Sequence, residues 1–124
     1  AYGQAVIVNP AFAERHADAV RGFLRALIAG IRLTYDNPAQ TIDDVIAQID
    51  GASRDLELER LRLVLNDNIV TDEVRSHGLG TIDAARFNAA RDALAAGFKF
   101  RKTLRVSDVV DDTLLPPADA RRIN

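Results

Sequence analysis

Residues 2–8 read Tyr-Gly-Gln-Ala-Val-Ile-Val, and this stretch decides how the rest of the chain is interpreted. Its centre, Ala5–Val8, is a continuous run of apolar and mostly β-branched residues, which is typical of a strand covered on both faces in a parallel α/β sheet. Everything after Asn9 predicts helices and turns, so no second strand is available to pair with it. Because an unpaired strand leaves its backbone N–H and C=O groups without partners, we expect the chain to be the C-terminal piece of a larger α/β protein.

The composition is that of a folded module without strong electrostatic attraction to polyanions. The chain has 124 residues, of which 48% are apolar and 27% charged, and this balance argues against disorder. The formal net charge of −2 predicts no general attraction to nucleic acid or to an anionic membrane. Cysteine is absent, which excludes disulfides, thiolate catalysis and most structural zinc sites. No stretch reaches the roughly 18 consecutive apolar residues of a membrane span.

Helix signals begin directly after this stretch. Asn9-Pro10 predicts a helix start, because Asn caps helices and Pro fits the first helical position. The helical pattern runs from there to Tyr35 with a break near His16, and Asn37-Pro38 then ends one helix and begins the next. Residues that recur at three- and four-residue steps predict the core of this half. They are Val20, Phe23, Leu24, Leu27, Ile31 and Tyr35, followed by Ile42, Val45, Ile46 and Ile49.

The second half has equally clear helix boundaries. Gly51 predicts the end of one helix, and Ser53 predicts the cap of the next. The wide apolar surface of that next helix predicts that it is buried on two sides. Thr71 opens a short helix that ends at Gly78–Gly80, and Asp83 caps a last long helix to about Ala96. The apolar residues expected to face inward are Leu56, Leu58, Leu61, Leu63, Val64 and Leu65, then Phe87, Ala90, Leu94 and Phe98. Ser107 predicts one or two more helical turns, and the tail from Leu114 onward is expected to be extended and loosely ordered.

Residues with catalytic or metal-binding chemistry are few, and each has a structural explanation. His16 and His77 lie in no metal-ligand spacing, and the acids Asp108, Asp111 and Asp112 lack the spacing and glycine of a calcium loop. Gly78-Leu79-Gly80 follows no strand and lacks the ending of a phosphate loop, so it predicts a C-cap and a turn. The three serines have no nucleophile motif around them. We therefore expect no enzymatic activity, no cofactor and no metal.

DNA binding is also disfavoured. The segment from Arg54 to Gly80 contains two helices with a tight connection, which is the outline of a helix-turn-helix. Its second helix, however, begins with Asp72 and Glu73, where residues that read bases are required. Phosphates repel acidic side chains, so we expect no nucleic-acid partner.

Taken together, the order of these segments resembles the periplasmic solute-binding proteins of ABC importers. The closest subgroup is the nitrate, sulfonate and taurine type, with the proteins that bind thiamine-pyrimidine precursors. The matching segments are residues 2–12 and 14–26, Tyr35–Pro38 with Ile42 and Val45, Asp55–Leu61, Gly78–Asp83 with Arg86, Leu94 and Gly97, and Leu114–Pro116. No single motif is diagnostic, and the resemblance rests on their common order and spacing along nearly the whole chain.

The resemblance implies a two-lobe α/β protein that closes like a hinge on a small solute and presents the closed form to a membrane permease. This chain then corresponds to the C-terminal part: a returning strand at residues 2–8 and about five to six helices that complete the first lobe. A periplasmic or otherwise exported location, with or without a lipid anchor, follows from the same resemblance. It also implies that most residues that contact the solute lie outside this sequence.

Four residues are the candidate solute-binding positions. Tyr2, Gly3 and Gln4 lie near the expected crossing between lobes, and Asn9 lies at the turn from strand to helix, where ligands bind in open α/β sheets. The competing interpretation is structural, with Tyr2 packing, Gly3 permitting a bend and Asn9 capping a helix.

Two other functions stay open. A free-standing helical protein would dimerise through an exposed apolar face or by pairing Ala5–Val8 with its copy, and the chain itself is expected to form homo-oligomers in this way. The effector-binding half of a transcription regulator is the third possibility. A neighbouring permease and ATPase gene would favour transport, whereas a fused DNA-binding segment would favour regulation.

Overall fold

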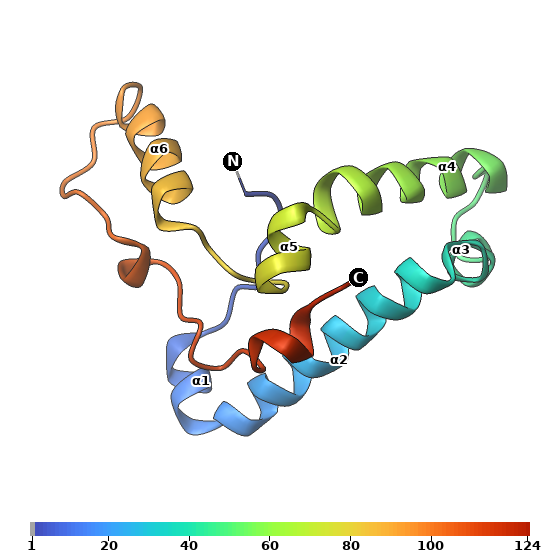
Figure 1. Ribbon diagram of the computed structural model, residues 1–124, viewed down its shortest axis with the longest axis horizontal. Helices are drawn as coiled ribbons and strands as arrows, with labels where there is room; N and C mark the ends of the chain where they lie inside the picture. Colours follow the sequence, from blue (N-terminus) through green and yellow to red (C-terminus); the bar gives the residue numbers. More distant parts are fainter. Residues whose placement is uncertain (1) are drawn as a thin grey trace.

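The computed structural model describes residues 2–124, and in this range the chain consists of helices and irregular segments without a β-strand (Figure 1). The mostly-α prediction is therefore confirmed. The α-helices are α1 (Pro10–Arg15), α2 (Ala17–Asp36), α3 (Pro38–Ile46), α4 (Arg54–Val64), α5 (Asp72–His77) and α6 (Ala84–Ala95). Shorter elements are the π-helical η1 (Leu65–Ile69) and the 3₁₀ turns η2 (Val106–Asp108) and η3 (Ala118–Arg121).

The predicted boundaries of the N-terminal helices are confirmed. The Asn9 side chain accepts hydrogen bonds from the N–H groups of Ala11 (2.9 Å) and Phe12 (3.3 Å), and Pro10 occupies the first turn. The chain leaves helical geometry at His16, with φ −132° and ψ 43°, and α2 starts at the next residue. Asn37 separates α2 from α3, although its side chain caps neither N–H group of the new helix.

The core lies where α2, α3, α4 and η1 meet. Figure 1 shows α2 leading to α3 at the right-hand end of the view, from where α4 runs back toward α5. Among residues 2–124, the buried apolar residues are Val20, Ile28, Ile42, Leu58, Leu65, Val70 and Ile123. Helix α6 lies apart from this group in Figure 1, and it contacts the segment around η2, where the Leu104 carbonyl oxygen accepts a hydrogen bond from Arg91. None of the helices in residues 2–124 combines the length and apolar character that a membrane crossing requires.

The strand predicted for residues 2–8 is wrong for this structure. The segment is irregular, and Val6, Ile7 and Val8 are exposed. A strand exists only when a neighbouring strand accepts and donates its ladder hydrogen bonds. No segment among residues 2–124 supplies that neighbour, so the β-forming pattern of Ala5–Val8 has no partner here.

Several of the predicted core stripes are also wrong. Phe23 and Leu27 of α2 are exposed, as are Leu94 in α6 and Phe98 after it. On α4, Leu58 is buried but Leu56 and Leu63 are exposed, so this helix is covered on one side and is not sandwiched. The periodicity predicts an apolar face, but burial requires a second element to cover that face, and within the described residues many faces have none.

The tail is more ordered than its composition predicts. After the irregular segment at residues 109–117, η3 packs against α5 and the buried Ile123 follows it. The carbonyl oxygen of Arg122 accepts hydrogen bonds from the Arg32 guanidinium on α2, at 3.1 and 2.8 Å. The C-terminal segment thus contacts both α2 and α5 and links these two helices.

Candidate functional site

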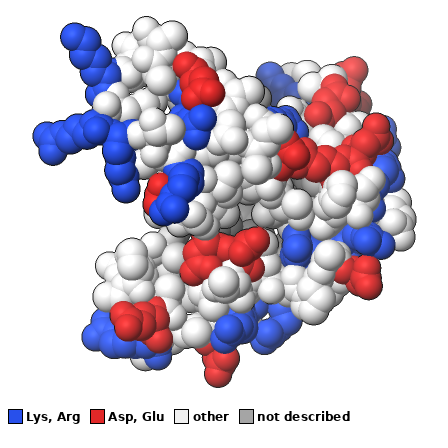
Figure 2. Space-filling view, turned by 60° about the vertical axis from the view of Figure 1, so that its left-hand side comes forward, with Lys and Arg blue, Asp and Glu red and all other residues white. Residues whose placement is uncertain are grey.

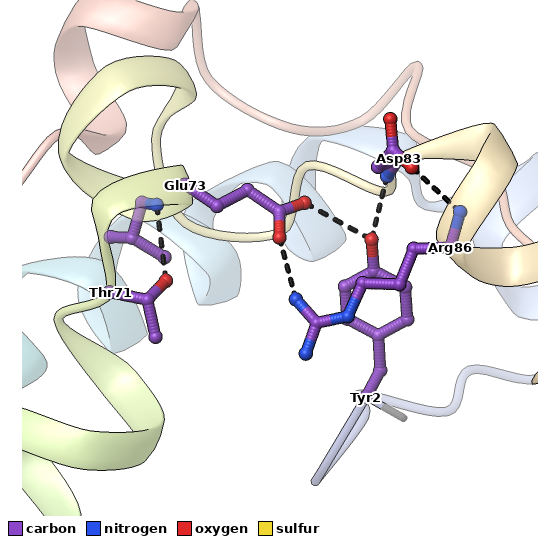
Figure 3. Close-up of polar contacts among 6 residues, drawn as sticks. Tyr2, Thr71, Glu73, Asp83 and Arg86 are labelled. Carbon is purple, nitrogen blue, oxygen red and sulfur yellow. Dashed lines mark hydrogen bonds and ion pairs between the residues drawn. The ribbon is translucent and has the colours of Figure 1, made fainter.

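The most organised group of polar side chains surrounds Tyr2, where three distant segments meet (Figure 3). Thr71 caps α5, since its hydroxyl accepts a hydrogen bond from the Val74 N–H at 3.3 Å, and this start places Glu73 on the first turn. Asp83 caps α6 in the same way, accepting from the Arg86 N–H at 2.7 Å. The two capped helices therefore present an acid and a base toward the same point.

Tyr2 fills the space between these two side chains. Its hydroxyl donates to Glu73 Oε1 at 3.1 Å and accepts from the Asp83 N–H at 2.7 Å. The Arg86 guanidinium lies over the ring, with Cζ 4.5 Å from the ring centroid, and Nη1 donates to Glu73 Oε2 at 2.7 Å. We call this group of Tyr2, Glu73, Asp83 and Arg86 the Tyr2 cluster. It ties the N-terminal segment to α5 and to α6.

The electrostatics of the Tyr2 cluster favour a neutral phenol. Partial burial is the largest effect that raises the pKa of Tyr2 above its ordinary value, and the neighbouring Glu73 carboxylate raises it further. The hydrogen bond from the Asp83 N–H and the charge of Arg86 act in the opposite direction. A protonated hydroxyl is also what the geometry requires, because a phenolate has no proton to donate to Glu73.

A second set of contacts holds the turn that joins α5 to α6. The Arg121 guanidinium donates from Nε to the Pro116 carbonyl oxygen at 2.7 Å and from Nη1 to Thr81 Oγ1 at 3.1 Å and to the Leu79 carbonyl oxygen. The Leu79 N–H donates to the Arg121 carbonyl oxygen at 2.9 Å. The docked tail thereby fixes residues 78–81, two positions before the cap of α6, and supports the Tyr2 cluster indirectly.

Two open hollows lie beside this turn. The first has a volume of about 620 Å³ and lies between the turn, α6 and the tail, with Arg91, Arg105 and Arg121 among its lining residues. The second, of about 600 Å³, lies against α5 and the start of α6 and includes Glu73 and Arg86 of the Tyr2 cluster. The basic groups of the first hollow already have acceptors: Arg105 pairs with Asp108, and Arg91 bonds to the Leu104 carbonyl oxygen at 2.8 Å.

The four candidate solute-binding residues are not brought together. Tyr2 belongs to the Tyr2 cluster and Asn9 caps α1, as the structural interpretation expects. Gly3 and Gln4 are exposed, and Gly3 does not have the positive φ that would require glycine. The lining of the two hollows includes none of the four. Their role in solute binding therefore stays a prediction.

Sequence reasoning missed Glu73, Arg86 and Arg121. Glu73 was interpreted only as an acid at the start of a helix that would repel phosphates, and this interpretation makes no reference to Tyr2. The partners in the Tyr2–Glu73 hydrogen bond are 71 residues apart. No local pattern reports such a contact, since it depends on where the tail and the turn place α5.

The acids and histidines form no metal centre within residues 2–124, where no group of three such side chains has suitable geometry. Asp108 pairs with Arg105, and its side chain also accepts from the Arg105 N–H at 2.9 Å. These contacts lower the pKa of Asp108 to about 2, with the Arg105 guanidinium as the main cause. Asp111 accepts hydrogen bonds from the N–H and hydroxyl of Thr113.

Comparisons with models of known protein families, with curated protein sequences and with solved structures found no match to this chain.

Proposed function

We propose that this chain is the C-terminal region of the solute-binding component of an ABC-type importer. In this proposal the complete protein is exported, has no enzymatic activity, and captures a small molecule by closing two lobes around it. The closed form then docks on the membrane permease. The fragment would contribute helices that complete the first lobe and would leave most of the solute contacts to the rest of the protein.

The observation that carries the proposal is the agreement between helix boundaries and the segments that resemble this family. Asn9-Pro10 begins α1, Asn37-Pro38 joins α2 to α3, and the Gly78–Gly80 turn precedes the cap of α6. These are the points at which the resemblance depends on order and spacing. Capping residues account for these helix ends locally, so the support for the proposal lies in their common order and spacing along the chain.

The large exposed surface supports the same proposal. The chain exposes 9122 Å², whereas a compact monomer of 13.6 kDa is expected to expose about 6,600 Å². Large apolar side chains on every major helix contribute to this excess. A lobe formed with further strands and helices would cover such faces, and it would supply the neighbours that Ala5–Val8 lacks.

Calorimetry on two proteins tests the proposal. The complete product of the gene that contains this sequence is titrated with nitrate, taurine, other sulfonates and thiamine-pyrimidine precursors, and the 124-residue chain is titrated in parallel. We expect the complete product to bind one of these solutes and the chain alone to bind none tightly, because a hinge-closing site needs both lobes. A gene product that begins close to Ala1 and stays in the cytosol, or micromolar binding by the chain alone, would contradict the proposal.

A further inference from the structure

The segment at residues 3–8 is tethered at both ends but has no partner between them. At one end, the Tyr2 hydroxyl is held by Glu73 and by the Asp83 N–H. At the other end, Asn9 is fixed as the cap of α1. Between these anchors, no backbone N–H or C=O group of residues 3–8 has a hydrogen-bond partner among residues 2–124. Two fixed ends limit the conformations of the segment, which lowers the entropy cost of ordering it against a partner.

The side chains of this segment are those of a pairing strand. Val6, Ile7 and Val8 are β-branched and exposed, and the exposed fraction of Ile7 reaches 93%. Natural edge strands carry Lys, Pro or other charged residues that prevent pairing with another chain. Residues 3–8 contain no Lys and no other charged residue, and the first proline of the chain is Pro10. The segment is uncharged throughout, so two copies can approach each other without repulsion.

The exposed area is large enough for a stable interface between two copies. The excess of about 2,500 Å² over a compact monomer is about three times the roughly 800 Å² that each partner buries in a standard protein–protein interface. Figure 2 shows wide uncharged areas between the charged groups on one face of the molecule. A two-stranded ribbon alone is marginally stable, but the exposed apolar side chain of Phe12, on the helix that directly follows the segment, can add to the interface.

We propose that residues 4–8 pair with the same residues of a second copy, as an antiparallel two-stranded ribbon across a two-fold axis. The two-fold symmetry makes the surface self-complementary, because each copy offers the same unpaired backbone edge. The dimer is a property of this chain and does not rest on the proposed role in solute uptake. A null result in the solute titrations would leave it intact, and its own failure would leave those titrations unaffected.

Sedimentation equilibrium of two matched variants tests the pairing. The unaltered chain is expected to sediment at twice the 13.6 kDa of one copy. Ile7→Lys places like charges at the ribbon and should raise the dimer dissociation constant about tenfold or more. Leu33→Lys, on α2, replaces a side chain that is also highly exposed, and it should leave the constant within about twofold. Both positions are exposed, so circular dichroism should show unchanged helix content.

Disulfide scanning gives an independent measurement, because the chain has no cysteine of its own. Single cysteines are placed at each of residues 5–8 and oxidised. In an antiparallel ribbon, strand residues rise about 3.4 Å each, so equivalent positions two residues from the axis are about 14 Å apart. That distance exceeds the reach of a disulfide, about 7 Å between Cα atoms. We therefore expect cross-linking to peak at one position or at two adjacent positions.

Each alternative mode of association gives a different experimental result. A dimer weakened by Leu33→Lys but not by Ile7→Lys would show that helix faces associate, and this would overturn the proposal. A monomer that forms no cross-link at any of the four positions would show that the segment does not pair with a second copy, and this would also overturn the proposal. Equal cross-linking at all four positions would show parallel pairing, which also contradicts the proposed ribbon.

Discussion

Replacement of Gly78 by alanine tests how the docked tail supports the turn beside the Tyr2 cluster. Gly78 follows α5 with φ 89° and ψ 159°, a combination available almost only to glycine. A Cβ built there would lie 2.9 Å from the Ala118 carbonyl oxygen and 2.9 Å from Arg121 Cβ, both in η3. The substitution therefore strains the backbone and also forces the tail away from the turn.

The expected loss combines these two effects. The backbone strain is worth about 1–3 kcal/mol. Displacement of the tail exposes Ile123, whose exposed fraction is only 4%, and an apolar side chain of this size contributes about 1.5–3 kcal/mol when buried. We therefore expect a loss of about 3–5 kcal/mol in the free energy of unfolding. Gly51→Ala is the matched control, because its φ of 73° is also positive but nothing lies within 4 Å of the added Cβ. Its expected cost is about 1 kcal/mol, from the backbone alone.

Urea unfolding followed by far-ultraviolet circular dichroism measures the difference. With a slope of about 2 kcal/mol per molar urea, the midpoint should fall by about 2 M for Gly78→Ala and by about 0.5 M for Gly51→Ala. Combined with Ile123→Ala, Gly78→Ala should cost less than the sum of the single changes, since both act through the same docked tail. Equal midpoints for the two glycine variants would refute the reasoning, because most of the expected difference comes from contact between the added Cβ of Gly78→Ala and η3.

Two further predictions concern single polar contacts. Tyr2→Phe keeps the ring under Arg86 but removes the hydroxyl, and a hydrogen bond worth about 1 kcal/mol should speed amide exchange at Asp83 about fivefold; an unchanged rate would show that the contact is not formed in solution. The Asp108 carboxylate should titrate near pH 2 by NMR, so the stability from its pairing with Arg105 is present above about pH 4 and is lost as the pH falls toward 2. In Arg105→Ala the midpoint should rise toward the ordinary value for Asp, and an unchanged midpoint would assign the low pKa to another cause.

The helix boundaries were predictable because their causes are local. Asn9 and Asp83 cap helices through bonds to N–H groups two or three residues away, and Gly78 ends α5 with a positive φ. Such contacts involve only neighbours in the sequence, so the residue types at those positions are sufficient to predict them. The π-helical turn at Leu65–Ile69 was missed, since nothing in its residues distinguishes it from the end of α4.

The candidate site was predictable only in part, because its contacts are not local. Tyr2 was selected as a candidate for solute binding, which stays a prediction, and the residues that hold it, Glu73 and Arg86, come from two other helices. Their positions depend on the turn that Arg121 fixes from the far end of the chain. A contact of this kind requires the packing of the tail, and the composition of the tail gave no sign that it docks.

The failed predictions of burial have a common physical cause. Of the stripe predicted on α2, Val20 is buried whereas Phe23 and Leu27 are exposed, and the buried Ile28 lies outside that stripe. A stripe has an apolar face whether or not a neighbour covers it, so periodicity predicts which side chains would be buried together and not whether a partner is present. Residues 2–8 follow the same logic, with a β-forming sequence and no neighbouring strand. The helix boundaries of this chain agree with its sequence, but its core contains few buried residues. A chain combines these two properties when its apolar faces are shaped for contacts with another polypeptide segment.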